Sequence, residues 1–184
     1  FDDVATTYLE NVNVENIPNY TKSELRKMFA PRNTTKLVDT LYECGENMIT
    51  KHNEYTDKFG KDNVKSTVMT WTDGVDNCSI HSESELNSKI CEWQTNDNIN
   101  FMFIAANQDA IKTGKSMGFT ANNCITCSAT PACASAVYRT ASNALGRAVS
   151  GFDPSFTQFE RNTIIGAGAG AGAGGKRTRD NTTS

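Results

Sequence analysis

The sequence lacks the features that mark general nucleic-acid-binding and membrane-spanning proteins. Its 18 Lys and Arg residues are outnumbered by 21 Asp and Glu residues, for a net charge of −3. Nucleic-acid surfaces need clustered cations to bind phosphates, and the only locally basic stretch is Lys176–Arg179. No apolar run approaches the roughly 20 residues that span a bilayer. We therefore predict a soluble chain with no nucleic-acid partner and no membrane span.

Cysteine is also sparse, with six residues in 184. A chain of this length can bury its own core and does not need a disulfide scaffold. The spacing of Cys124, Cys127 and Cys133 invites a zinc interpretation, with Cys78, Cys91 or His81 as the fourth ligand. Strong zinc motifs, however, pair two such doublets or add histidines at fixed spacing. We expect zinc to be less favoured than a local disulfide or free buried thiols.

Strand-like and helix-like segments alternate through the middle of the chain. Apolar runs over Thr67–Thr72 and Asn100–Ala106 predict buried strands, and a shorter stretch at 124–126 predicts an edge strand. Amphipathic periodicity, caps and breakers predict helices over 37–59, 82–94, 110–117 and 131–149. The alternation predicts an α/β fold, a Rossmann-like, doubly wound and mostly parallel sheet with helices on both faces.

The two ends of the chain follow different patterns. Phe1–Asp3 reads as the exit of a strand, Val4–Ile17 as an edge strand, and a short helix follows Thr21. Beyond Gly151 the periodicity lapses, and Gly166–Gly175 is a Gly-Ala repeat of the kind that forms flexible spacers. We predict an α/β domain over residues 1–150 and an extended, flexible tail over 151–184.

The stretch from Val64 to Ser79 joins a strand to a polar loop. Its β-branched and apolar run stops at Asp73-Gly74, which places a carboxylate at the C-terminal end of a strand. Open α/β sheets bind their ligands at that edge. A turn role is the alternative for Asp73, because Asp-Gly is a common turn pair.

Segments in this order resemble the von Willebrand factor type A domain family. The loop-to-helix stretch Pro31–Asp39, the strand ending in Thr72-Asp73-Gly74, the strand and turn Phe101–Asp109, and Lys115–Phe119 each look like a family segment. The likeness covers roughly residues 1–149. It lacks the family's first strand and its Asp-x-Ser-x-Ser loop, for which Asp153–Thr157 has the spacing of a substitute.

The resemblance implies a metal-ion-dependent adhesion site, in which Mg²⁺ is held by oxygens from three loops. Carried over to this sequence, the threonine ligand is Thr35 and the aspartate ligand is Asp73. Without the third loop the site is incomplete, and cation affinity depends on the number and charge of the ligands. The alternative for Thr35 is a helix N-cap.

The resemblance favours a non-enzymatic module that binds a protein partner through the loops that carry Thr35, Asp73, Asp76 and Asn77. The alternative is a structural subunit of a virion, as a minor capsid protein, or of another large shell. In that case Phe152, Phe156 and Phe159 would contact neighbouring subunits. Catalysis ranks last, because Cys78 and His81 have no third group in the sequence to orient them.

Overall fold

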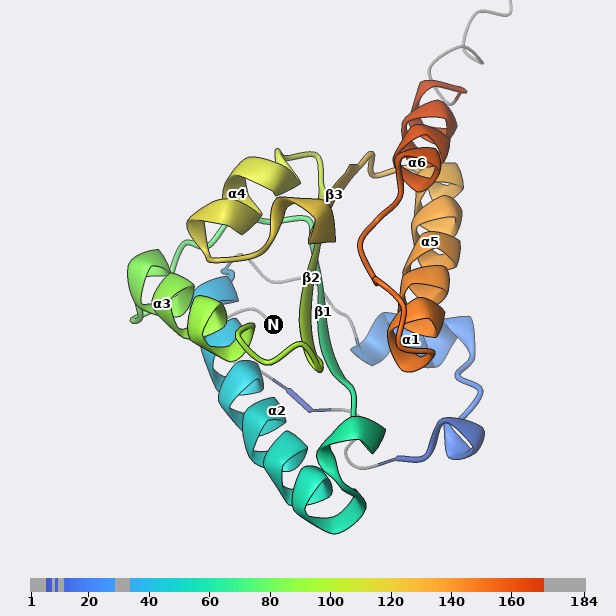
Figure 1. The fold of residues 1–184 in the computed structure, drawn as a ribbon. Coiled ribbons are helices and arrows are strands. Elements are labelled where there is room, and N and C mark those ends of the chain that lie inside the picture. Colours follow the sequence, from blue (N-terminus) through green and yellow to red (C-terminus); the bar gives the residue numbers. More distant parts are fainter. Residues whose placement is uncertain (1–5, 8, 10–11, 29–33, 171–184) are drawn as a thin grey trace, which may run out of the picture.

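The computed structural model describes residues 6–170 apart from 8, 10–11 and 29–33 (Figure 1). The predictions for Phe1–Asp3, for the start of the Pro31–Asp39 segment and for residues 171–184 therefore lie outside the described residues. No described helix is long and apolar enough to cross a membrane.

The described strands form one parallel sheet. Strands β1 (Ser66–Thr72), β2 (Ile99–Ala106) and β3 (Cys124–Cys127) lie in the order β1-β2-β3. Met69 pairs with Met102, and Phe103 with Cys124. Nearly every residue of β2 is buried, as a central strand covered on both faces requires. The three strands predicted in the middle of the chain and their parallel pairing are confirmed.

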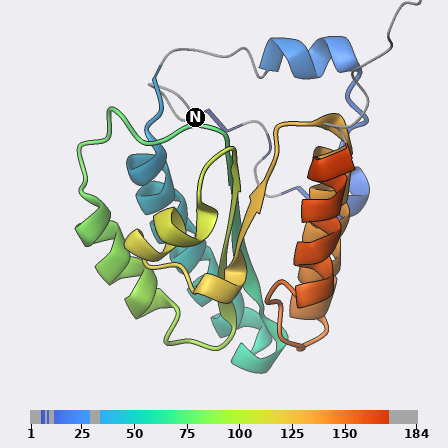
Figure 2. The ribbon, with the colours of Figure 1, turned by 90° about the horizontal axis from the view of Figure 1, so that it is seen from above.

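Three helices cover one face of the sheet (Figure 2). They are α2 (Leu37–Phe59), α3 (Glu83–Trp93) and α4 (Ala110–Ser116). Short 3-10 turns, η2 (Lys61–Asn63) and η3 (Ala121–Asn123), precede β1 and β3. The apolar layer beneath these helices includes Leu37, Leu41, Leu86, Ile90, Phe101 and Phe103. The capping box predicted at Ser82 and Glu85 is present and begins α3.

Helices α5 (Pro131–Val149) and α6 (Gln158–Gly170) cover the opposite face. The layer beneath them includes Met102, Ile104, Ile125, Val137, Phe156 and Ile164. Helices on both faces confirm the predicted α/β class. The extended tail predicted from residue 151 is wrong for Gln158–Gly170, which forms a helix packed on α5.

A capping box explains why α6 begins where it does. The Thr157 hydroxyl accepts from the Glu160 N–H at 3.2 Å, and the Glu160 carboxylate accepts from the Thr157 N–H at 2.8 Å. The pattern Thr157-x-x-Glu160 stands in the sequence as a helix-start signal. Ile164, 1% exposed, then anchors the helix in the core.

A salt bridge fastens α6 to the end of α5. Arg147 donates to the two Glu160 carboxylate oxygens at 2.9 and 3.0 Å. Desolvation raises the pKa of Glu160, but the hydrogen bonds from Arg147 and Thr157 outweigh it, so the pKa lies below its ordinary value. The carboxylate is thus held charged inside a buried contact.

The N-terminal edge strand predicted over Val4–Ile17 is wrong for the described residues of that range. Val14–Asn16 forms a 3-10 turn, η1, because the Asn13 side chain accepts from the Glu15 N–H at 3.1 Å. The short helix predicted after Thr21 is confirmed as α1 (Lys22–Met28).

Candidate functional site

Loops from several parts of the chain meet at the C-terminal edge of the sheet, because the carboxyl ends of parallel strands share that edge. Gln108, after β2, donates from Nε2 to the Gly74 carbonyl after β1 at 3.1 Å. Asn107, in the left-handed region at φ 59°, accepts from the Ala129 N–H after β3 at 3.1 Å. The edge is therefore tied together across all three strands.

The predicted metal ligands Thr35 and Asp73 lie in neighbouring loops at this edge. A Cβ added to Gly74 would lie 3.1 Å from the Thr35 hydroxyl, so this hydroxyl lies against the residue that follows Asp73. No group of three or more His, Cys, Asp or Glu side chains in the described parts of the chain could hold a metal ion. The two residues supply a hydroxyl and a carboxylate, and Mg²⁺ would need water or a partner for the rest.

The Asp153–Thr157 segment cannot replace the third metal-binding loop. The Phe156 N–H donates to the Asn122 carbonyl at 3.0 Å, and Asn122 precedes β3. This segment therefore lies at the N-terminal edge of the sheet, opposite Thr35 and Asp73. The Asp153 side chain accepts from the Ser155 N–H at 2.9 Å and so makes a local turn.

Hydrogen bonds pin the loop after β1, which we call the β1–α3 loop (residues 73–82), to the start of α2. Asn77 exchanges bonds with Thr35: its Oδ1 accepts from the Thr35 N–H at 2.9 Å, and its N–H donates to the Thr35 carbonyl at 3.1 Å. Asp76 accepts from the Val38 N–H at 3.2 Å and from the Ser79 hydroxyl. Asp76 and Asn77, predicted as partner contacts, thus hold the loop in shape.

Asp39 is the central anchor of this loop, a role that sequence reasoning missed. Its carboxylate accepts from the backbone N–H groups of Ile80 at 3.0 Å and His81 at 2.9 Å, and it lies 2.8 Å from His81 Nδ1. Burial raises the pKa of Asp39, but the bonds from His81 and Ile80 outweigh it and lower the pKa. Its place in the first turn of α2 would by itself indicate only a favourable interaction with the helix dipole.

The Asp39–His81 pair has the geometry of a carboxylate that orients a histidine. The His81 ring also stacks on Tyr42, with the ring centroids 4.3 Å apart. No hydrogen bond joins His81 to Cys78 or to a side-chain hydroxyl among the residues that the structure describes. An oriented base without a bonded nucleophile is not a nucleophilic catalytic set.

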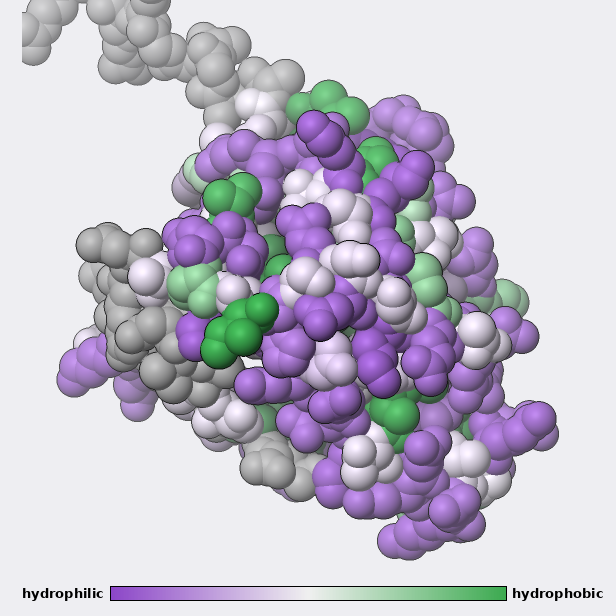
Figure 3. All heavy atoms as spheres, turned by 90° about the vertical axis from the view of Figure 1, so that its left-hand side faces the viewer, coloured by the Kyte–Doolittle hydropathy of each residue, from purple (hydrophilic) through white to green (hydrophobic). Residues whose placement is uncertain are grey.

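The pinned loop presents apolar side chains to solvent. Val75 is 62% exposed and Ile80 is 87% exposed. Asp73 and Glu83 are exposed beside them, and Asp76 is partly exposed. The face of the molecule on the α3 side is otherwise largely hydrophilic, with hydrophobic residues in isolated spots (Figure 3).

The three phenylalanines predicted to contact neighbouring subunits differ in burial. Phe152 and Phe159 are 69% and 80% exposed, whereas Phe156 is 4% exposed and packs in the core beneath α5 and α6. Phe156 is therefore a structural residue, and the prediction of a partner contact there is wrong.

The cysteines do not form the considered zinc site. Cys124 packs in the layer beneath α4, whereas Cys127 and Cys133 pack in the layer beneath α5. Residues three apart on a strand face opposite sides of the sheet, so Cys124 and Cys127 cannot share a metal ion or a disulfide. The described cysteines are free thiols.

Thiol reactivity tests this arrangement. Burial raises the pKa of Cys124 to about 12 and of Cys127 to about 11, and the thiolate is the reactive form. We expect a thiol-specific disulfide reagent to modify the exposed Cys91 rapidly and to leave Cys124 and Cys127 intact until urea unfolds the chain. Peptide mass spectrometry measures the labelling at each site, and native labelling of Cys124 at the rate of Cys91 would contradict this burial.

Comparison with family models, curated proteins and solved structures finds no match for this chain.

Proposed function

We propose that the protein is a non-enzymatic binding module, of the von Willebrand factor type A kind, that engages a protein partner through the β1–α3 loop. The observation that carries this proposal is a loop pinned at Asp39, Asp76 and Asn77 that nevertheless leaves Ile80 87% exposed. An isolated exposed apolar residue is ordinary. A fixed loop that exposes two apolar side chains at the ligand-binding edge of a parallel sheet favours a role in binding a partner.

The fixed shape of the loop matters for affinity. A partner that docks on a mobile loop must order it, at a cost of about 0.5 to 1.5 kcal/mol for each rotamer-rich side chain that it immobilises. Here, hydrogen bonds made within the chain already order the backbone. The acidic side chains of Asp73, Asp76 and Glu83 around the apolar pair favour a partner with an apolar contact and a basic rim.

Magnesium has at most an auxiliary part in this proposal. Thr35 and Asp73 offer one hydroxyl and one carboxylate, while the Asp76 carboxylate already accepts from Val38 and Ser79. We propose that the apolar contact of Ile80 carries the affinity and that a cation at Thr35 and Asp73 adds to it only when a partner completes the coordination.

A second candidate is assembly into a larger structure, which the exposed rings of Phe152 and Phe159 favour. Both rings lie near the α5–α6 connection, away from the β1–α3 loop. Subunit contacts commonly bury aromatic side chains, so the two candidates predict different sensitive residues.

Site-specific photo-cross-linking with competition tests the binding proposal. A benzophenone amino acid at position 80 should cross-link to one protein species from the source cells, and excess unlabelled wild-type chain should suppress that cross-link. The Ile80→Asp chain should compete at least about tenfold less well, because a charge cannot fill an apolar contact.

The matched control is Val149→Asp, at a position on α5 that is 78% exposed. The unlabelled Val149→Asp chain should suppress the cross-link as well as the wild-type chain does. Equal competition by Ile80→Asp and wild type would overturn the proposal. Loss of competition by Phe152→Asp and Phe159→Asp, with Ile80→Asp unaffected, would favour assembly. The same assay with EDTA should retain the cross-link, and its complete loss would make the cation essential.

A further inference from the structure

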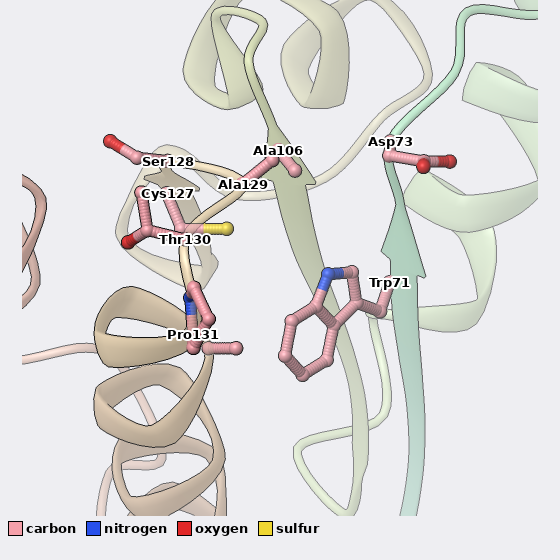
Figure 4. A pocket seen from close by; sticks show the side chains of 9 residues that line it. Trp71, Asp73, Ala106, Cys127, Ser128, Ala129, Thr130 and Pro131 are labelled. Atoms are coloured by element: carbon pink, nitrogen blue, oxygen red, sulfur yellow. The ribbon is translucent and has the colours of Figure 1, made fainter.

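A pocket opens at the same edge of the sheet, between the end of β1 and the start of α5 (Figure 4). Its volume is about 390 Å³, within the range of roughly 300 to 1,000 Å³ typical of ligand sites. It is lined by residues from all three strand ends and the first turns of α5, among them Trp71, Asp73, Ala106, Cys127, Thr130 and Ala134.

An aromatic ring forms one wall of this pocket. The Trp71 indole faces Thr130 and Pro131 across the pocket (Figure 4). The Trp71 ring also contacts the ring of Tyr138, with the two ring centroids 4.6 Å apart. Three further lining residues, Ala106, Ala129 and Ala134, have only a methyl group as side chain. Small residues opposite a large ring leave room for an inserted side chain.

Three polar side chains of the lining, Asp73, Thr130 and Cys127, are not placed to pair with a charge inside the pocket. The Asp73 carboxylate points away from the other lining side chains (Figure 4). The Thr130 hydroxyl accepts a hydrogen bond from the Cys133 N–H at 3.2 Å and thereby caps the N-terminus of α5. The Cys127 thiol stays neutral, because burial raises its pKa to about 11. A charged group inserted here would lose its water without a matching partner.

We propose that this pocket receives a neutral apolar side chain from the protein partner. The inference rests on the proposed function, since Asp73 belongs both to the pocket rim and to the β1–α3 loop, so one partner could cover both. Trp71 would act as the aromatic anchor wall, as tryptophan commonly does at the centre of interfaces. The partner residue is of the leucine, methionine or phenylalanine class.

Capped single amino acids test the chemistry of the pocket without the partner. The probes are the N-acetyl amides of phenylalanine, leucine, lysine and glutamate, titrated into full-length protein labelled with ¹³C at alanine methyl groups. We expect the phenylalanine and leucine probes to shift the methyl signals of Ala106, Ala129 and Ala134 in the millimolar range. The lysine and glutamate probes should bind at least tenfold more weakly.

Each alternative result overturns the inference. Stronger binding of the lysine probe would make this a cation site on Trp71 and Asp73, and stronger binding of the glutamate probe would make it an anion site at the start of α5. Absence of shifts for the apolar probes would show that the pocket does not accept a side chain. Shifts of the same methyls on removal of residues 171–184 would identify the chain's own terminus as the occupant.

Variants separate the pocket from the loop. Ala134→Phe should fill the pocket and abolish the probe shifts at Ala106 and Ala129, whereas Ser135→Phe, on an exposed neighbouring position of α5, should leave them unchanged. Ile80→Asp should also leave the probe shifts unchanged. The two proposals can fail separately. If the apolar probes bind but the chain carrying the photo-cross-linker at position 80 forms no cross-link to a partner, the pocket assignment stands and the proposed function is overturned.

Discussion

Replacing Asp39 by alanine should destabilise the protein by about 3 kcal/mol and release the β1–α3 loop. Asp39 is 8% exposed, and its carboxylate accepts from the N–H groups of Ile80 and His81 and lies 2.8 Å from the His81 ring nitrogen Nδ1. Removing the carboxylate leaves these partly buried donors without their acceptor. A hydrogen bond to a charged group contributes about 1.5 to 3 kcal/mol, and the freed loop regains some water contacts. Urea unfolding followed by tryptophan fluorescence measures the loss.

The matched control is Asp57→Ala, an exposed aspartate in the same helix α2. This variant should change the free energy of unfolding by less than about 0.5 kcal/mol, as exposed substitutions generally do. Amide hydrogen exchange should rise across residues 76–81 in Asp39→Ala and stay at the wild-type level in Asp57→Ala. Unchanged exchange in Asp39→Ala would show that other contacts hold the loop.

The contribution of Asp39 should depend on pH with a defined sign. Its pKa in the folded chain lies below the unfolded value of about 3.9, so its stabilisation is fully present above that value. It is lost as the pH falls through the folded pKa. The difference in unfolding free energy between wild type and Asp39→Ala should therefore shrink on acidification below about pH 4, and a constant difference would contradict the assigned role.

Ile164→Ala should cost about 2 to 5 kcal/mol, as large-to-small substitutions in packed cores do. Ile164 is 1% exposed and inserts from α6 into the layer beneath α5. The neighbouring Ile165, 67% exposed in the same helix, provides the matched control, because its replacement by alanine makes the same chemical change without a cavity. Thermal and urea unfolding of both variants measure the contrast.

The outcome decides whether α6 belongs to the folded domain. A large loss for Ile164→Ala, and a loss below about 0.5 kcal/mol for Ile165→Ala, would show that the helix contributes to the core. Equal and small effects would mean that the segment behaves as the extended tail that its composition predicted.

Most elements were predictable because their signals are local. The apolar run at Thr67–Thr72 became β1, the continuous run at Asn100–Ala106 became the central strand, and the Ser82–Glu85 capping box became the start of α3. The helix at Gln158–Gly170 was missed because the Gly-Ala composition outweighed the short capping box at Thr157. Glycine and scattered aromatics indicate disorder only where no core is available to bury them.

Local patterns predict the α/β class and the position of Asp73 at the end of a strand, because strand and helix periodicities and the shared carboxyl edge of parallel strands can be read from short segments. The position of Thr35 beside it was expected only from the family resemblance. Which residues build this edge depends on tertiary contacts. Asp39 and Ile80 lie 41 residues apart, and Trp71 faces the start of α5 from another part of the chain. Contacts across such separations depend on the packing of whole layers, which no local pattern encodes.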